Sequence, residues 1–101
     1  MKNILITGGC GFIGSHFVLN QIQNGNLIVN LDKLTYAANP NNLKQIAAHK
    51  NYHFIKGDIN DQKLISKILN KFSIDWLVNF AGAERFLKAI HELFPAPIYT
   101  R

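Results

Sequence analysis

Short apolar runs alternate along the chain with longer segments in which apolar residues recur every three or four positions. Runs rich in β-branched and aromatic residues, typical of buried strands, occupy residues 2–7, 27–31, 52–55 and 76–80. Segments with one apolar face, typical of amphipathic helices, occupy residues 12 to about 24, 43–48 and 61–72. This alternation predicts an α/β fold with a parallel sheet, right-handed crossovers and helices on both faces.

Start and stop signals lie between these segments. Gly25 follows the first predicted helix, at the place where a left-handed residue often ends one, and Asp61 is positioned to cap the third. After the fourth strand, residues 84–94 place apolar side chains on one helical face before Pro95-Ala96-Pro97 ends the pattern, which predicts a further helix. With about four strands, the fourth is left as an exposed edge.

The composition fits one small globular domain. Of 101 residues, 48% are apolar and 17% are charged, which allows one modest core and leaves no room for a second domain. Residues 1–7 are too short for a signal peptide, and no apolar run approaches the roughly 18 residues of a membrane span. The single cysteine, Cys10, cannot form an internal disulfide. We therefore expect a cytoplasmic protein without a membrane partner.

The net charge of +5 indicates a basic surface. Its Lys and Arg residues are scattered singly, without a basic run or the aromatic-basic signature of an RNA-binding sheet. We therefore expect no nucleic-acid partner, while such a surface suits an anionic nucleotide.

Three glycines, Gly8, Gly11 and Gly14, separate the first predicted strand from the first predicted helix. Their G-x-x-G-x-x-G spacing is a variant of the dinucleotide-binding fingerprint. Gly8 permits a tight turn, Gly11 lets the backbone approach a pyrophosphate, and Gly14 lets the helix pack closely on the sheet. Free N–H groups and the positive end of the helix dipole then face the phosphates. The alternative is a glycine-rich turn without a ligand.

Two aspartates follow the next two predicted strands. Asp32 lies where a carboxylate accepts hydrogen bonds from the adenosine ribose hydroxyls and repels a 2′-phosphate, which favours NAD over NADP. Lys33 beside it weakens that preference slightly. Asp58 follows the third strand, at the edge where ligands of parallel sheets collect. The alternative for Asp32 is a turn or capping residue, and the alternative for Asp58 is simple turn chemistry.

With these positions laid out, the chain resembles the extended short-chain dehydrogenase/reductase family. Residues 7–14 (TGGCGFIG) resemble the TGGxGFIG opening of that family. Residues 29–37 (VNLDKLTYA) are very similar to the segment typical of dTDP-glucose 4,6-dehydratases, and residues 57–59 (GDI) and 78–81 (VNFA) match in order and spacing. The resemblance implies the N-terminal half, about four strands, of a Rossmann-type fold.

The same resemblance implies NAD as the cofactor and assigns residues around it. Phe12 and Ile13 would line the pyrophosphate. Asp32, Lys33, Leu34 and Thr35 would surround the adenosine ribose. Asp58 and Ile59 would lie near the adenine, and Ala81 would begin the loop near the nicotinamide. Enzymes of this family oxidise a nucleotide sugar at C4 with NAD, eliminate water across C5 and C6, and return the hydride to C6. The product serves deoxysugar biosynthesis, including rhamnose, and the family forms homodimers.

After the fourth strand the sequence departs from the family pattern, which reads like NFAAESHVDRS. Residues 79–88 read NFAGAERFLK, with one residue inserted, Glu84 as the candidate family glutamate, and the HVDRS portion missing. The resemblance thus covers residues 1–81, and residues 82–101 form a divergent tail. The sequence also ends before the Tyr-x-x-x-Lys pair of the family. We therefore expect a truncated chain without dehydratase turnover, produced by a frameshift, an early stop or a split gene.

A local match to Tyr-x-x-x-Lys, at Tyr52 and Lys56, lies in a predicted strand. There the two residues stand about 13 Å apart at roughly 3.3 Å per residue, whereas the motif needs them one helical turn apart. We therefore assign neither a catalytic role.

Cys10 lies beside a helix N-terminus, which could lower the pKa of its thiol. The interpretation we favour is that Cys10 is simply a small residue of the loop. The four histidines do not have the spacing of metal ligands, so we expect no metal site; they are His16, His49, His53 and His91.

Three other interpretations stay open. The chain could be a stand-alone nucleotide-binding module, or the partner of a separately encoded remainder. It could belong to a nucleotide-sugar epimerase, although residues 32–36 (DKLTY) argue against that. Finally, half of a doubly wound fold has little stability in reserve and could fail to fold.

Overall fold

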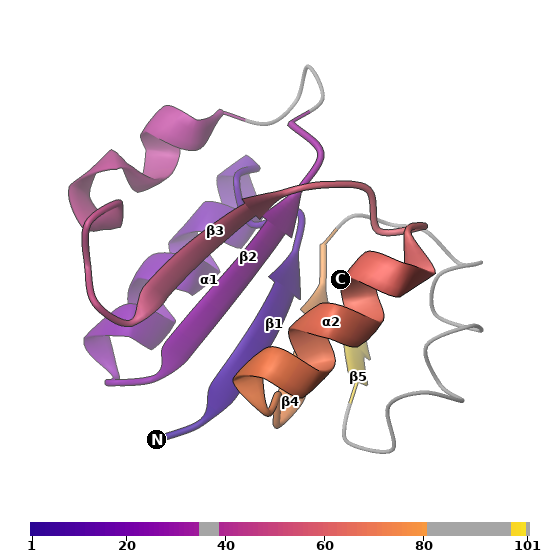
Figure 1. Ribbon diagram of the computed structural model, residues 1–101. Helices are drawn as coiled ribbons and strands as arrows, with labels where there is room; N and C mark the ends of the chain where they lie inside the picture. Colours follow the sequence, from indigo (N-terminus) through magenta and orange to yellow (C-terminus); the bar gives the residue numbers. More distant parts are fainter. Residues whose placement is uncertain (35–38, 81–97, 101) are drawn as a thin grey trace.

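The computed structural model describes residues 1–34, 39–80 and 98–100, and within them a five-stranded sheet runs through the middle of the molecule (Figure 1). Every neighbouring pair of strands is parallel, and their order is β3-β2-β1-β4-β5. The strands are β1 (Asn3–Thr7), β2 (Leu27–Asp32), β3 (Tyr52–Lys56), β4 (Trp76–Asn79) and β5 (Ile98–Thr100).

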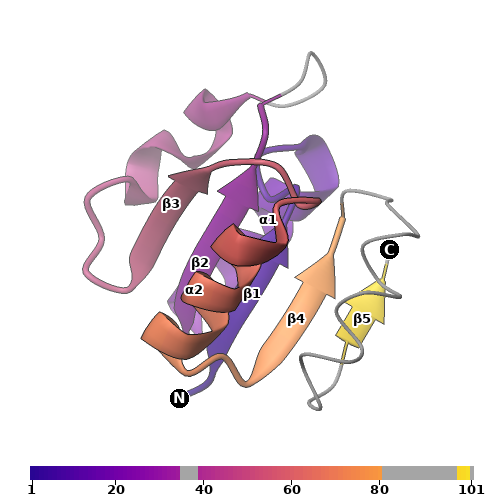
Figure 2. The same ribbon diagram turned by 45° about the vertical axis from the view of Figure 1, so that its right-hand side comes forward.

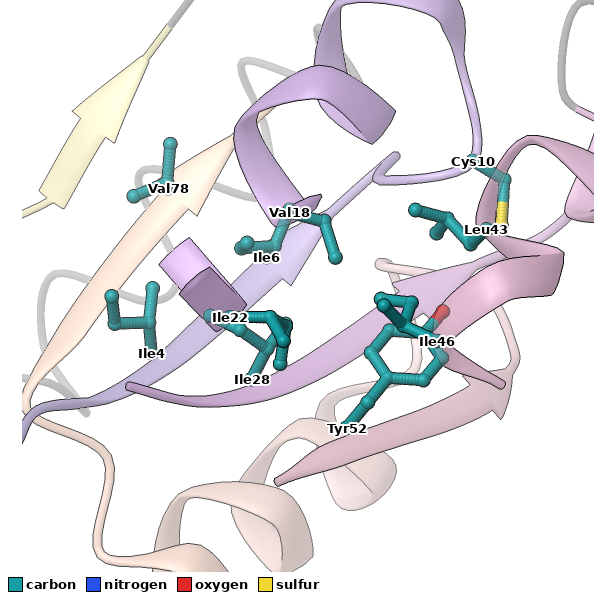
Figure 3. Close-up of a cluster of buried hydrophobic side chains, with 10 residues drawn as sticks. All are labelled: Ile4, Ile6, Cys10, Val18, Ile22, Ile28, Leu43, Ile46, Tyr52 and Val78. Atoms are coloured by element: carbon teal, nitrogen blue, oxygen red, sulfur yellow. The ribbon is translucent and has the colours of Figure 1, made fainter. Parts of the chain in front are cut away.

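Helices cover both faces of the sheet, as expected for an α/β fold. The helix α1 (Phe12–Gln23) and the short 3₁₀ helix η1 (Pro40–Ile46) lie on one face, and α2 (Gln62–Phe72) lies on the other (Figures 1 and 2). Because successive residues of a strand face opposite sides, the core is divided into two clusters. Ile4 and Ile6 pack with Val18 of α1, whereas Leu5 packs with Ile65 of α2. Figure 3 shows the cluster on the α1 side.

The four strands predicted from the apolar runs are confirmed, each with one boundary displaced by a single residue. The two long helices are confirmed as well. Asp61 caps α2, because its Oδ1 accepts the Leu64 N–H at 3.2 Å. Gly25 has a φ of +83° just after α1, the left-handed backbone that favours glycine at a helix end. Local sequence signals were sufficient for these elements.

Two predictions about the architecture are corrected. The sheet has a fifth strand, and β5 pairs with β4 through Leu77 and Ile98, so β4 is not the exposed edge. Three residues directly after Pro-Ala-Pro show no periodicity, and only pairing with β4 makes them a strand. The helix expected at residues 43–48 is a 3₁₀ helix that begins earlier, where the Asn39 side chain accepts the Asn41 N–H at 3.0 Å. The helix expected at residues 84–94 lies outside the described residues.

Candidate nucleotide-binding site

The glycine turn lies at the point where the strand order of the sheet switches direction: β2 and β3 lie on one side of β1, and β4 and β5 lie on the other. β1 lies between β2 and β4, and the turn joins the carboxyl end of β1 to α1. In open parallel sheets, ligands bind at the carboxyl ends of the strands beside such a switch point. Phe12, Asp32 and Asp58 lie at or just beyond these strand ends. The topology therefore brings the predicted phosphate, ribose and adenine residues to one edge of the sheet.

The first half of the turn is tied to β2. The Gly8 N–H donates to the Leu31 carbonyl at 2.9 Å. The Gly9 N–H donates to Asn30 Oδ1 at 3.0 Å, and the Cys10 N–H donates to Asp32 Oδ2 at 2.9 Å. All three amides are thus occupied by the protein itself. They hold the turn in place and leave phosphate binding to the amides that follow.

The second half of the turn presents unpaired donors. The first N–H···O bond of α1 runs from Ser15 to the Gly11 carbonyl at 2.9 Å, and Gly11 has no side chain to cap the helix. Within the described part of the chain, the N–H groups of Phe12, Ile13 and Gly14 have no acceptor. Free N–H groups and the helix dipole make this end of α1 attractive to an anion. The three amides therefore suit a pyrophosphate.

The physical reason for a glycine differs between positions 8, 11 and 14 of the turn. A Cβ on Gly14 would lie 2.5 Å from the Gly8 carbonyl oxygen, so a side chain there collides with backbone. Gly8 has a φ of +76°, in the left-handed region. Gly11 differs, because a Cβ there would meet the Gly8 oxygen at an ordinary 3.6 Å. The fold does not require glycine at position 11, and the open space beside its backbone fits the close approach of a phosphate.

Asp32 lies at the end of β2, beside the turn, as predicted. Its carboxylate is buried and accepts two backbone N–H groups, from Cys10 at 2.9 Å and from Leu34 at 2.8 Å. Leu34 has a φ of +61°, so this bond holds a strained backbone turn just after the strand. Among the described residues each carboxylate oxygen accepts one hydrogen bond, and a carboxylate oxygen has the capacity to accept two.

Lys33 and Asp58 join the ends of β2 and β3. The Lys33 Nζ lies 3.3 Å from Asp58 Oδ2, and both side chains are exposed to a large extent. The backbone N–H of Asn60, which donates to Asp58 Oδ1 at 2.9 Å, together with the Lys33 ammonium lowers the pKa of Asp58. Ile59 packs against the cluster on the α2 side. Thr35 and Ala81, also predicted to approach the cofactor, lie outside the described residues.

Sequence reasoning missed a set of buried polar residues beneath the turn. Asn30, in the middle of β2, accepts from Gly9 and donates to the Tyr52 hydroxyl. Thr7 and Asn79, at the ends of β1 and β4, are linked by a hydrogen bond from the Thr7 hydroxyl to Asn79 Oδ1. The available signal was a polar residue inside or at the end of each apolar run.

The Cys10 thiol is buried, and this decides between the two interpretations of that residue. Burial, with the neighbouring Asp32 charge, raises the pKa of Cys10 to about 11. The lowered pKa considered from the sequence is therefore wrong, and Cys10 is a small buried residue of the loop. Burial outweighs the helix N-terminus because Cys10 precedes the helix and its own N–H is used by Asp32.

The local Tyr-x-x-x-Lys match is confirmed as a strand feature, because Tyr52 and Lys56 are the first and last residues of β3. Tyr52 is buried, and its pKa is raised to about 12 chiefly by burial. Its hydroxyl accepts a hydrogen bond from Asn30 at 3.0 Å. Tyr52 is therefore part of the core. Among the described residues, His, Cys, Asp and Glu form no group that could hold a metal ion.

A separate apolar groove of about 570 Å³ lies between α1 and strands β4 and β5. Its lining residues include Ile13, His16, Phe17, Trp76, Phe80 and Tyr99. Because the Ile13 side chain lines this groove, the part of Ile13 that a phosphate can use is the backbone N–H. No helix in the described part of the chain combines the length and apolar character needed to cross a bilayer.

The parallel sheet, the glycine turn with its free amides and the acidic end of β2 define a nucleotide-binding domain of the Rossmann type. The comparison with family models is more specific. The model of the GDP-mannose 4,6 dehydratase family matches residues 5–100, and the chain belongs to this family.

The relatives found by sequence include several dTDP-glucose 4,6-dehydratases. The enzyme of Xanthomonas campestris pv. campestris is 41% identical over 90 residues, which are 89% of this chain and 26% of that protein. The human enzyme is 40% identical over 83 residues, 80% of this chain and 24% of that protein. The chain thus spans about a quarter of the length of these curated relatives.

Solved structures give the same result for the fold. The dTDP-glucose 4,6-dehydratase of Bacillus anthracis, in complex with NAD, has a TM-score of 0.91 and 34% identity, and the match covers 99% of this chain and 37% of that one. The UDP-glucose 4-epimerase of Stenotrophomonas maltophila, with bound NAD, has a TM-score of 0.72 and 26% identity over 95% of this chain and 30% of that one. The prediction of a Rossmann-type sheet and of this family resemblance is confirmed.

Proposed function

We propose that this chain binds NAD at the glycine turn. The observation that carries the proposal is the row of N–H groups at Phe12, Ile13 and Gly14, which have no acceptor in the described part of the chain. They follow Cys10, whose own N–H donates to the carboxylate of Asp32. A pyrophosphate needs donors of this kind, and an adenosine ribose needs an acceptor at the end of β2. Dehydratase structures that resemble this chain contain NAD, which supports the same cofactor here.

The remaining contacts are proposed from position at the sheet edge. The Asp32 carboxylate and the backbone of Lys33 and Leu34 suit the ribose, with Thr35 after them. Asp58 and Ile59 suit the adenine, because they follow β3, the neighbour of β2. Ala81 follows β4 on the other side of β1 and is proposed to approach the nicotinamide.

The wider function we propose is that of the NAD-binding portion of a dTDP-glucose 4,6-dehydratase. The identities of 40–41% to such enzymes support a nucleotide-sugar dehydratase. The epimerase match, at 26% identity, supports the shared nucleotide-binding fold more than a shared substrate. Bound NAD would supply the hydride acceptor for oxidation of the sugar. Sugar binding and the dehydratase reaction are proposed for a protein that contains the rest of the fold of its relatives.

The first experiment is an NMR titration of the ¹⁵N-labelled 101-residue chain with NAD. We expect saturable shifts at the amides of residues 11–14 and around Asp32, and weaker binding of NADP. Asp32→Asn removes the carboxylate charge, so NAD affinity should fall roughly tenfold, as expected for a lost charge-assisted hydrogen bond. The absence of saturable shifts at millimolar NAD would contradict the proposal.

Two further proposals accompany this function. The homodimer typical of the resembled family is tested by light scattering of the purified chain with and without NAD. A cytoplasmic location is tested by fractionation of cells that express the protein. Both stay predictions from sequence and resemblance.

A further inference from the structure

Asn30 lies in the middle of β2, directly beneath the glycine turn. It pairs with Ile6 of β1 and Phe54 of β3 in the register of the sheet. Its neighbours in the strand, Val29 and Leu31, belong to the apolar core, whereas Asn30 carries an amide into the buried layer at 0% exposure. A buried amide is costly unless its donors and acceptor are used. The bonds that Asn30 makes therefore indicate its task.

Both ends of the Asn30 amide have partners. Oδ1 accepts the Gly9 N–H at 3.0 Å. Nδ2 donates to the Tyr52 hydroxyl at 3.0 Å and to Cys10 Sγ at 3.4 Å. The oxygen end thus faces the first half of the turn, and the nitrogen end is held by a core tyrosine and by the turn cysteine.

The contact between Asn30 and Gly9 is also close. A Cβ on Gly9 would lie 2.3 Å from Asn30 Oδ1, so the turn rests directly on this amide. The amides proposed to bind the pyrophosphate follow only three to five positions later in the chain. Because Asn30 is inaccessible, a ligand cannot touch it, and any effect on binding passes through the turn.

We propose that Asn30 is a positioning residue for dinucleotide binding. Its amide sets the height of the Gly9 peptide above the sheet and so places the start of α1 relative to Asp32. An apolar residue at position 30 would leave the Gly9 N–H buried without an acceptor, and the turn would move to find another. This inference rests on the proposed function, because it specifies how the same site is held in shape.

The test compares Asn30→Leu with Tyr52→Phe in the full 101-residue chain. The leucine variant removes the acceptor of Gly9, whereas the phenylalanine variant removes one partner of Asn30 and leaves the Gly9 bond in place. We expect Asn30→Leu to lower NAD affinity at least tenfold and adenosine affinity less than threefold, because adenosine makes no pyrophosphate contact. Tyr52→Phe should keep NAD affinity within threefold, even where both variants lower the melting temperature alike.

A third variant covers the case in which Asn30→Leu does not fold. Asn30→Asp at pH 6 keeps an acceptor for Gly9, and burial beside Asp32 favours the protonated carboxyl group, which reproduces the donor as well. It should keep NAD affinity within threefold, whereas Asn30→Ala should not. Equal losses of NAD and adenosine affinity in the variants without the Gly9 acceptor would overturn the proposal, as would equal NAD losses in Tyr52→Phe.

The failure of the proposed function is distinguishable from the failure of this inference. If the wild-type chain binds no NAD, the proposed function fails, and the ligand-free NMR spectrum decides the role of Asn30. The Gly9 amide must then shift and lose protection from hydrogen exchange in Asn30→Leu or Asn30→Ala but not in Tyr52→Phe. An unchanged Gly9 amide in the Asn30 variants overturns the inference.

Discussion

Gly14 packs directly on Gly8, so that a Cβ added to Gly14 would lie 2.5 Å from the Gly8 carbonyl oxygen. The same carbon would lie 3.0 Å from the Gly9 Cα. Both obstacles are backbone atoms, which cannot move aside as a flexible side chain can. The start of α1 is therefore pressed against the turn that precedes it, and this contact orients the amides proposed to bind phosphate.

Gly14→Ala should destabilise the fold and weaken NAD binding together. The added methyl group forces α1 away from the turn, and overpacking of this kind costs about 1–3 kcal/mol. Thermal or urea unfolding measures the loss, and the NMR titration measures the affinity. A variant with unchanged stability would contradict the close contact between these two glycines.

Gly11→Ala should separate stability from binding. Its Cβ would make only an ordinary contact, and its φ of −72° suits alanine, so the stability should change by no more than about 0.5 kcal/mol. The methyl group would fill the space that a pyrophosphate needs, and NAD affinity should fall about tenfold, or about 1.4 kcal/mol. Unfolding curves and titrations of the two glycine variants, measured side by side, check both statements. Unchanged NAD affinity would show that the phosphates do not approach position 11.

Local patterns predicted most of the sheet, whereas contacts between distant segments were not readable from sequence. The run at residues 2–7 predicts β1 because both faces of a parallel sheet are covered. Side chains that point to either face are then buried, so the strand is apolar throughout. β5 could not be predicted, since Ile98–Thr100 becomes a strand only by pairing with β4.

The same division holds for the candidate site. The spacing of Gly8, Gly11 and Gly14 predicted a turn between β1 and α1, and Asp32 was expected at the end of β2. The partner of Asn30 could not be deduced, because a polar residue in a strand does not reveal which backbone group it meets. The sequence also could not show that the fold itself tolerates a side chain at Gly11, because this depends on the distance from a Cβ at that position to its neighbours.

Acid titration should detect the link between Asp58, Asn60 and Lys33. The Asn60 N–H and the Lys33 ammonium lower the pKa of Asp58 in the fold, below the value of about 3.9 for a free aspartate. The resulting stability is present above about pH 4 and is lost as the pH falls through the lowered pKa. Lys33→Gln should raise the pKa of Asp58 part of the way, because the Asn60 bond remains. Carboxyl NMR of both chains measures the pKa, and high salt should reproduce part of the shift by screening Lys33. An unchanged pKa in Lys33→Gln would rule out the ion pair as a cause.

The Cys10 thiol should be unreactive in the folded chain, and its burial should appear as a loss of stability at alkaline pH. Burial and the Asp32 charge raise the pKa of Cys10 to about 11, so about one thiol in a thousand is ionised at pH 8. Because the folded pKa exceeds the unfolded value of about 8.5, the stability is complete below that pH and is lost as the pH rises toward about 11. Tyr52, whose pKa is raised to about 12, extends the loss to higher pH. Labelling of native protein with iodoacetamide at pH 8 should therefore proceed only through transient unfolding or opening of the turn. Cys10→Ala should lose stability less steeply between about pH 9 and 11 than the wild type does. Rapid labelling of the native chain would show instead that the thiol is accessible and that the turn does not seal it against Asp32 and Asn30.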